Sequence, residues 1–319
     1  PGNKKKFFLY KSGRYALYHG LFEILKKNNN LKKILIPSFV CKEIMPVFKE
    51  LRINVEFYQL SDGLRIDAEE IRDKTSIGET ILFVINYFGF PADWELVNTL
   101  KKELGLFIIE DNAHSPFSKY RDTNLGSLGD MSFNSLRKFL PLLSGSELCI
   151  KNTDENEFYG ERTRRPSTEE IIYSLRHLKP SLIKKSKKNI STDEDFDLKC
   201  SSIDYLSNLL VNKDYFNKAV ITEKRIKNYK FWKDYLKNQD LEYFDDLVLN
   251  KNICPYVFPC IAQDEKHIKT IIEWGFANGI NIINWPKLPN LTGFTLPSRK
   301  LKNVVFYPVN HQYDIEKLL

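Results

Sequence analysis

The sequence has little of what stabilises secreted proteins or spans membranes. Its five cysteines are far apart and form no Cys-x-x-Cys pair, so a disulfide scaffold or a zinc site is not expected. The most apolar stretch, 81–90, is far shorter than the roughly 20 residues of a spanning helix. The sequence does not start with a basic segment followed by an apolar one, so no signal peptide is predicted. We therefore expect a cytoplasmic protein that does not enter a membrane.

Several common functional signatures are also missing. There is no Gly-x-Gly-x-x-Gly, no Walker loop and no Gly-x-Ser-x-Gly elbow. The five histidines show no metal-binding spacing, so no metal is expected. A net charge of +7 arises from 48 basic and 41 acidic residues and suits a small anionic ligand as well as nucleic acid. Because no basic-aromatic motif accompanies the charge, nucleic acid is not expected as a partner.

The first half of the chain alternates between two patterns of apolar residues. Short runs rich in branched residues predict buried strands at 34–36, 55–58, 81–85 and 106–109. Apolar residues at steps of three or four predict helices at 15–26, 41–51 and 94–104. This alternation predicts an α/β architecture with a mainly parallel sheet flanked by helices. Ligands of such sheets bind at the carboxyl ends of the strands.

The second half predicts a smaller α+β unit. Expected strands lie at 256–262, 280–283 and 302–307, and expected helices at 220–236, at 267–278 and from 315 onward. With about 150 residues per domain, 319 residues suggest two domains. We predict a large domain at 1–210 and a small C-terminal α+β domain at 211–319.

Residues 155–196 are the most basic and least periodic part of the chain. One interpretation is a solvated insertion, which is the usual meaning of a charged run. The other is an anion-binding loop over a site, with Arg162, Arg164 and Arg165 as its candidate ligands.

Three clusters could carry chemistry. Ser12-Gly13-Arg14 begins a predicted helix and is either a simple cap or an anion site made by free backbone N–H groups. Asp111 and His114 directly follow a predicted strand and are either a cap with a structural histidine or ligand-binding groups. Lys138 follows Arg137 and is either half of a surface pair or a nucleophilic amine.

The order and spacing of these clusters resemble the DegT/StrS-type sugar aminotransferases, which are fold type I pyridoxal-phosphate enzymes. The matching motifs are Ser12-Gly13-Arg14, Pro37-Ser38-Phe39, Phe88-Gly89-Phe90-Pro91-Ala92-Asp93, Glu110-Asp111-Asn112-Ala113-His114 and Gly126-Ser127-Leu128-Gly129-Asp130. Lys138 comes after the last of them. The resemblance is good over 9–151. It continues more loosely, for instance through Arg225-Ile226-Lys227-Asn228-Tyr229.

The resemblance implies pyridoxal 5'-phosphate as cofactor and a role for each matching residue. Lys138 would bind the cofactor aldehyde covalently and move the proton, Asp111 would keep the pyridine nitrogen protonated, and His114 would lie near the ring. The remaining cofactor-binding positions are Ser12, Gly13, Arg14, Phe39, Cys41, Ser132 and Ser135. Substrate would contact Tyr87, Arg162, Arg164 and Arg165.

Some positions depart from the family pattern. The segment before the lysine is short, so Ser132 competes with Ser135 for the phosphate. The usual glycine-rich turn after the lysine is replaced by residues 144–147, which keep one glycine. Cys41 stands where many members place an aromatic ring over the cofactor, so Phe39 or Tyr87 could take that place.

The resemblance implies transfer of an amino group, from glutamate, to a nucleotide-linked keto-sugar in polysaccharide or antigen biosynthesis, by a homodimer. Two alternatives remain. One is a fold-retaining pyridoxal-phosphate enzyme that dehydrates its substrate, against which Lys138 argues, since dehydrating members often lack the lysine. The other is a catalytically silent binding protein, suggested by Cys41 and the altered turn.

Overall fold

The computed structural model describes residues 7–151, 163–168, 171, 196–198, 201–213, 215–239, 241–289 and 297–319. Arg162 and most of the basic segment 155–196 lie outside the described residues. None of the helices in these ranges has both the length and the apolar character needed to span a bilayer.

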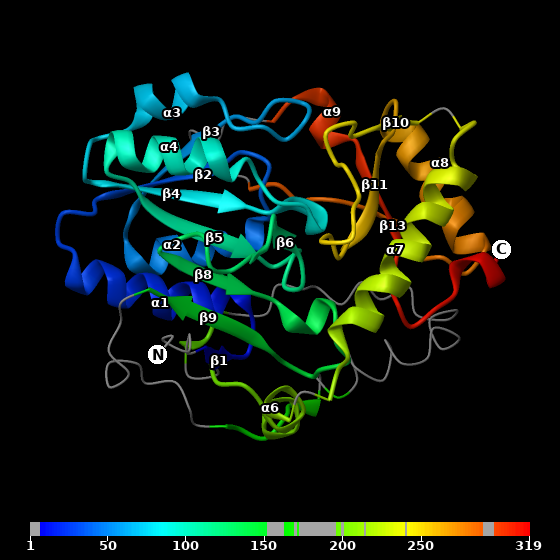
Figure 1. Cartoon of the computed structure of the whole chain (residues 1–319), viewed down its shortest axis with the longest axis horizontal. Coiled ribbons are helices and arrows are strands. Elements are labelled where there is room, and N and C mark those ends of the chain that lie inside the picture. The colour runs from blue at the N-terminus through cyan, green and yellow to red at the C-terminus, as the bar shows by residue number, and fades with distance from the viewer. Residues whose placement is uncertain are drawn as a thin grey trace.

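A seven-stranded sheet is built from the first half of the chain (Figure 1). Its strands, in spatial order, are β1 (Phe8–Tyr10), β9 (Ser146–Ile150), β8 (Met131–Asn134), β5 (Phe107–Asn112), β4 (Thr80–Ile85), β2 (Lys33–Pro37) and β3 (Asn54–Tyr58). The strands from β8 to β3 are parallel, and β9 runs antiparallel to both of its neighbours. The predicted α/β class with a mainly parallel, helix-flanked sheet is confirmed.

Helices flank this sheet. They are α1 (Gly13–Lys27), α2 (Met45–Leu51), α3 (Ala68–Lys74) and α4 (Trp94–Leu104). In Figure 1, α3 and α4 lie at the top of the view near β2 and β4, and α1 lies beside β8 and β9. The predicted bounds of α4 are confirmed, since the Asp93 side chain accepts the Leu96 N–H at its start and Gly105 takes a left-handed conformation at its end.

Not every predicted boundary is correct. The helix expected at 41–51 starts with a short 3₁₀ turn, η1 (Lys42–Ile44), and becomes α-helical at Met45, because Pro46 favours the first turn of a helix. The sequence pattern did not predict β1, β8, β9, α3 or the short pair β6 (Lys119–Tyr120) and β7 (Thr123–Asn124). Such short elements carry too little periodicity to be predicted.

A four-stranded antiparallel sheet is built from the second half. Its order is β10 (Glu242–Tyr243), β11 (Val257–Ile261), β13 (Val304–Pro308) and β12 (Ile283–Asn284). Helices α7 (Lys218–Tyr235) and α8 (Glu265–Ala277) lie beside it in Figure 1. The shorter elements are α6 (Tyr205–Asn212), α9 (Arg299–Lys302) and η7 (Ile315–Lys317).

Two expectations for this region were wrong in detail. The strand expected at 280–283 pairs only from Ile283, because Ile280 and Ile282 are buried in the core without joining the ladder. The helix expected from Ile315 is a 3₁₀ turn. Buried apolar residues of both sheets belong to one continuous core, and the domain boundary near residue 210 stays a prediction.

Candidate active site

Five parallel strands end at one edge of the large sheet, and predicted site residues lie at or beyond the ends of four of them, β2, β4, β5 and β8. Asp111 of β5 lies opposite Ile85 of β4 and Phe133 of β8. Directly beyond these strand ends come the turns η2 (Tyr87–Gly89) and η3 (Leu136–Lys138). The structure thus brings Asp111, His114 and Lys138 to the carboxyl edge, where ligands of such sheets bind.

Asp111 and His114 are buried with few polar partners. Among the described residues the Asp111 carboxylate accepts one N–H, that of Ala113 at 2.8 Å. Burial raises the pKa of Asp111 to about 6, although the Ala113 N–H and the Lys138 ammonium act against this rise. Burial, assisted by the same ammonium, holds the pKa of His114 well below its usual value. Its buried Nδ1 has no hydrogen-bond partner in the described part of the chain.

The amine of Lys138 lies among aromatic rings. Its Nζ is 5.3 Å from the ring centre of Tyr256, which in turn stacks on His114 at 4.6 Å between centroids. The ring of Phe88 also lies nearly parallel to His114, at 6.1 Å. Lys138 is close enough to influence the ionisation of Asp111, His114 and Cys41. These three side chains therefore surround one amine.

Cys41 belongs to the same cluster. Burial raises the pKa of its thiol to about 12, and the nearby Lys138 ammonium opposes the rise. The thiol is therefore neutral at physiological pH. Phe39 and Tyr87, the two rings expected to take the place of an aromatic at 41, contact each other, and the Tyr87 hydroxyl donates to the Phe39 carbonyl at 2.6 Å. Both side chains are buried, with ring centroids 5.5 Å apart.

The start of α1 meets the end of β8. A Cβ on Gly13 would lie 3.2 Å from the Asn134 carbonyl oxygen, so glycine permits this close approach. Ser12 precedes the helix, and its buried hydroxyl makes no capping hydrogen bond. Ser135 is likewise buried and makes no side-chain cap on η3. A helix amino terminus beside two hydroxyls that cap no helix is suited to bind an anion.

The two candidate phosphate serines differ in their surroundings. The Ser132 hydroxyl lies within β8 and donates to the Gly126 carbonyl at 2.7 Å. Ser135 lies beyond the strand, near Gly13. The Ser132 hydroxyl thus already has a hydrogen-bond partner, and the choice between the two serines for the phosphate stays a prediction. Arg14 lies on the first turn of α1, with its guanidinium 5.8 Å from the Tyr15 ring.

Glu110 explains why the Gly126–Asp130 motif is near the site. Its buried carboxylate accepts the N–H groups of Gly126, Leu128 and Gly129 at 2.6, 2.9 and 3.0 Å. It also accepts the Asn86 side-chain amide at 3.2 Å. One carboxylate therefore holds the loop between β5 and β8 and the segment after β4.

We expect Glu110→Gln to lower the free energy of unfolding by about 2 to 4 kcal/mol. The amide would turn one of these acceptor positions into a donor that faces a buried N–H. Urea unfolding followed by circular dichroism measures the change. The exposed Glu95→Gln variant, which loses an ion pair with Arg121, is the control and should change stability by less than about 1 kcal/mol. Equal effects of the two substitutions would contradict this account of Glu110.

The altered turn after the lysine is held by α6. The Ser144 hydroxyl donates to the Asp204 carboxylate at 2.6 Å, and the Ser207 hydroxyl accepts the Leu143 and Ser144 N–H groups at 3.0 and 3.2 Å. Gly145, the one glycine retained, has a φ of 151°. Side-chain hydrogen bonds thus support a turn for which the family pattern relies on glycines.

The contacts described for Arg164 lie outside this cluster. The Arg164 guanidinium donates to the carbonyls of Ser202 and Arg165 at 2.8 and 3.1 Å. No contact that the structure describes joins Arg164 or Arg165 to Lys138 or Asp111. Arg162 lies outside the described residues. Their role in substrate binding stays a prediction.

Several aromatic residues at the site were missed. Besides Phe88 and Tyr256, Trp285 and Phe306 lie 5.1 and 6.4 Å from His114 between ring centroids. Tyr256, Trp285 and Phe306 come from the second half of the chain, far from the motifs in sequence. No local pattern separates them from ordinary core residues, so only the tertiary structure could identify them.

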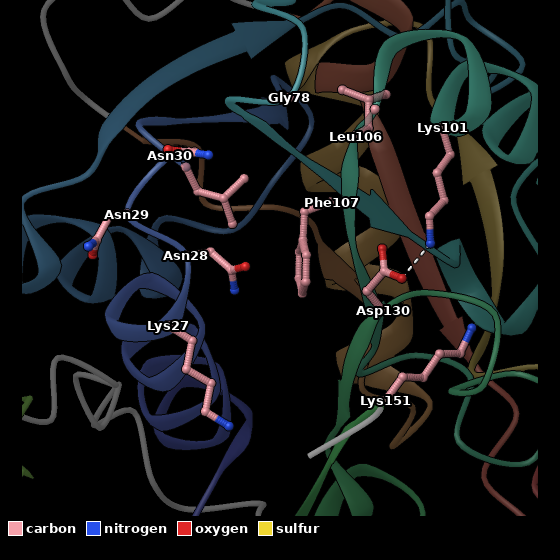
Figure 2. Close-up of a pocket in the computed structure, with 12 residues that line it drawn as sticks. Lys27, Asn28, Asn29, Asn30, Gly78, Lys101, Leu106, Phe107, Asp130 and Lys151 are labelled. Carbon is pink, nitrogen blue, oxygen red and sulfur yellow. Dashed lines mark hydrogen bonds and ion pairs between the residues drawn. The ribbon is translucent and has the colours of Figure 1, made fainter. Parts of the chain in front are cut away.

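A second hollow lies away from this cluster. Figure 2 shows a pocket of about 630 Å³ lined by the turn after α1 and by residues at the starts of β5 and β8. Its Lys101 and Asp130 form an ion pair. None of the predicted site residues lines it. The described residues also contain no group of three or more His, Cys, Asp or Glu side chains placed to hold a metal.

The fold and the position of the site define the class. PseC of Helicobacter pylori, an aminotransferase involved in the biosynthesis of pseudoaminic acid, superposes with a TM-score of 0.65 at 15% identity, covering 98% of this chain and 84% of PseC. The Escherichia coli GDP-4-keto-6-deoxy-D-mannose-3-dehydratase, solved with bound hydrated PLP, gives 0.65 at 16% identity, covering 98% and 86%. The chain has the fold of the type I aminotransferases.

The sequence comparison gives a partial match to one family. Residues 54–145 match the DegT/DnrJ/EryC1/StrS aminotransferase family. GDP-perosamine synthase of Escherichia coli O157:H7 is 31% identical over 68 residues, which are 21% of this chain and 19% of that protein. The chain matches only 25% and 19% of the lengths of two curated relatives. The resemblance to the DegT/StrS-type family predicted from the motifs is confirmed.

Proposed function

We propose that this chain is a pyridoxal-phosphate-dependent aminotransferase that moves an amino group from glutamate to a nucleotide-linked keto-sugar. The observation that carries the proposal is the cluster of Lys138, Asp111 and His114 at the carboxyl edge of the sheet. Among the described residues, Asp111 is a buried carboxylate with a single N–H partner and His114 has a buried ring nitrogen without one. Burying polar groups without hydrogen-bond partners costs free energy of folding, and a bound ligand can supply the missing partners.

The unsatisfied groups match the parts of pyridoxal phosphate. Asp111 would accept a hydrogen bond from the ring nitrogen, and the Nδ1 of His114 would contact a polar atom of the ring. The start of α1, with Ser12, Gly13 and Ser135, would hold the phosphate. When bound, this cofactor supplies an exchangeable aldehyde and a ring that stabilises a neighbouring carbanion.

The residues of this chain would then perform the binding and the proton transfer. Lys138 would attach the cofactor and afterwards move a proton with its freed amine. Asp111, once ionised beside the ring nitrogen, would hold the proton on that nitrogen. The aromatic rings of Phe88 and Tyr256 beside His114 would limit access of water.

The proposed substrate class rests on relatives. The printed names of GDP-perosamine synthase and of the dehydratase refer to GDP-linked sugars, and the name of PseC refers to a sugar acid. A chain with a net charge of +7 is compatible with a diphosphate-bearing substrate. We propose Arg162, Arg164, Arg165 and Tyr87 as substrate ligands, in a homodimer.

An absorbance spectrum tests the proposal. Purified protein mixed with pyridoxal phosphate should gain a band near the visible edge, and borohydride should remove that band and leave a pyridoxyl group on Lys138, located by peptide mass spectrometry. Glutamate should convert the bound cofactor to its amine form and release 2-oxoglutarate. A protein that shows no such band after the unbound cofactor has been removed would refute the proposal and favour a silent binding protein.

Dehydration is the second candidate, favoured by the likeness to the dehydratase. Product analysis separates the two reactions. An aminotransferase replaces the ketone oxygen of the sugar with an amino group and keeps every hydroxyl, whereas a dehydratase yields a sugar that has lost a hydroxyl as water. Cofactor that binds but does not respond to glutamate would favour dehydration.

A further inference from the structure

Arg225 is a buried cation that reaches from α7 to residues 136–140, the loop that carries Lys138 and is called the lysine loop below. Its side chain is 2% exposed. The guanidinium donates to the carbonyls of Pro255 and Tyr256, each at 3.1 Å, and to the carbonyl of Lys138 at 3.5 Å. It also lies over the Phe139 ring, 4.3 Å from the ring centre. One side chain therefore contacts both the lysine loop and the segment that enters β11.

No carboxylate of the described residues balances this cation. The described hydrogen bonds of its guanidinium all go to backbone carbonyls, and burial lowers the pKa of Arg225. Burying a guanidinium without a counter-ion is expensive, and well-packed apolar residues often replace buried charges without loss of stability. The location of Arg225 is thus better explained by what it contacts than by a gain in stability.

Arg225 contacts the backbone of the two residues, Lys138 and Tyr256, whose side chains meet at the Lys138 amine. Lys138 projects its Nζ over the ring of Tyr256, and Tyr256 stacks on His114. The Tyr256 N–H donates to the Phe88 carbonyl at 2.7 Å, so this segment is also tied to η2. Arg225 holds the backbone at both ends of the Lys138–Tyr256 contact. A planar guanidinium with several donors is suited to this, because it can bind more than one carbonyl and stack on a ring.

We propose that Arg225 is a positioning residue, which holds the Lys138 amine over Tyr256 beside His114 so that the amine can attach to the cofactor aldehyde. This inference rests on the proposed function. Arg225 would touch neither cofactor nor substrate. It would act through the backbone of residues 138 and 256, from the opposite side of the lysine loop.

Cofactor affinity in two backgrounds tests the proposal. Arg225→Met keeps the volume but removes the donors, and it should weaken pyridoxal-phosphate binding about tenfold when Lys138 is present, a coupling typical of residues in contact. In a Lys138→Ala background, where no amine needs positioning, Arg225→Met should leave the affinity unchanged. Equal weakening in both backgrounds would show a merely structural role, and no weakening in either would also overturn the proposal.

Hydrogen exchange of the cofactor-free protein provides an independent readout. We expect Arg225→Met to speed amide exchange in residues 136–140 and 255–257 while the central strands keep their protection. Lys227→Met, on the exposed side of the same helix, is the matched control and should change neither affinity nor exchange in those segments. Unchanged exchange in Arg225→Met, or faster exchange throughout, would overturn the proposal.

A conservative variant guards against misfolding. Arg225→Lys keeps the charge but offers fewer donors and no planar stack, so its affinity should lie between those of the wild type and Arg225→Met. An affinity as low as that of Arg225→Met would contradict the proposal, because Arg225→Lys retains donors that can reach a backbone carbonyl. A wild type that binds no pyridoxal phosphate would refute the proposed function, and the exchange experiment would still decide whether Arg225 holds the lysine loop.

Discussion

Lys138→Ala is expected to abolish the absorbance band and borohydride labelling and to lower the transamination rate by about 10⁴-fold or more. Lys138 is the amine that lies among Asp111, His114 and Cys41, and its loss removes both the covalent attachment and the proton carrier. Single-turnover conversion of bound cofactor with glutamate measures the rate.

Non-covalent cofactor binding should survive this substitution, because the phosphate and ring contacts belong to other residues. Lys227→Ala, an exposed lysine paired with Asp314, is the control and should leave spectrum and rate unchanged. A Lys138→Ala protein that retains the band would place the reactive amine elsewhere and refute the assignment.

Asp111→Asn is expected to have two opposite effects. It should slow amino transfer by about 10² to 10³-fold, because a neutral amide cannot hold the proton on the ring nitrogen as a carboxylate does. It should also stabilise the cofactor-free protein at pH 7.5 by about 2 to 3 kcal/mol. In that state a carboxylate with one described N–H partner is buried, and its pKa is raised from an ordinary value of 3.8 to about 6.

The sign of the pH dependence follows from this raised pKa. Below the pKa of the unfolded chain, Asp111 is protonated in both states and does not change the free energy of unfolding. As the pH rises from the unfolded pKa to the folded pKa, the unfolded chain loses its proton first, and the fold is destabilised. Cofactor-free wild type should therefore lose stability relative to Asp111→Asn as the pH rises from about 4 to about 6, and the gap should stay constant above that range. Urea unfolding at pH 4.5 and 7.5 measures the gap. A gap that does not grow with pH would refute the burial of an uncompensated carboxylate.

The sequence alone predicted much of the parallel sheet, and for a physical reason. Buried parallel strands are short runs of branched apolar residues, and the helices between them have one apolar face, so both carry a local signal. Asp111 and His114 could be assigned to the ligand-binding edge from the sequence because they directly follow such a run, the one that forms β5. The short strands β1, β6, β7, β8 and β9 carry no such signal and were missed.

The sequence by itself determined the fold class, the family resemblance and the residues of the chain's first half that meet at the sheet edge. Those follow from motifs in order along the chain. Only the tertiary structure showed that the Ser132 hydroxyl already has a partner and that Ser135 caps no helix, because a hydroxyl's partner depends on where the strand ends. It alone brought Tyr256 and Arg225 to Lys138, since these contacts join residues about ninety or more positions apart, and no local pattern encodes such a contact.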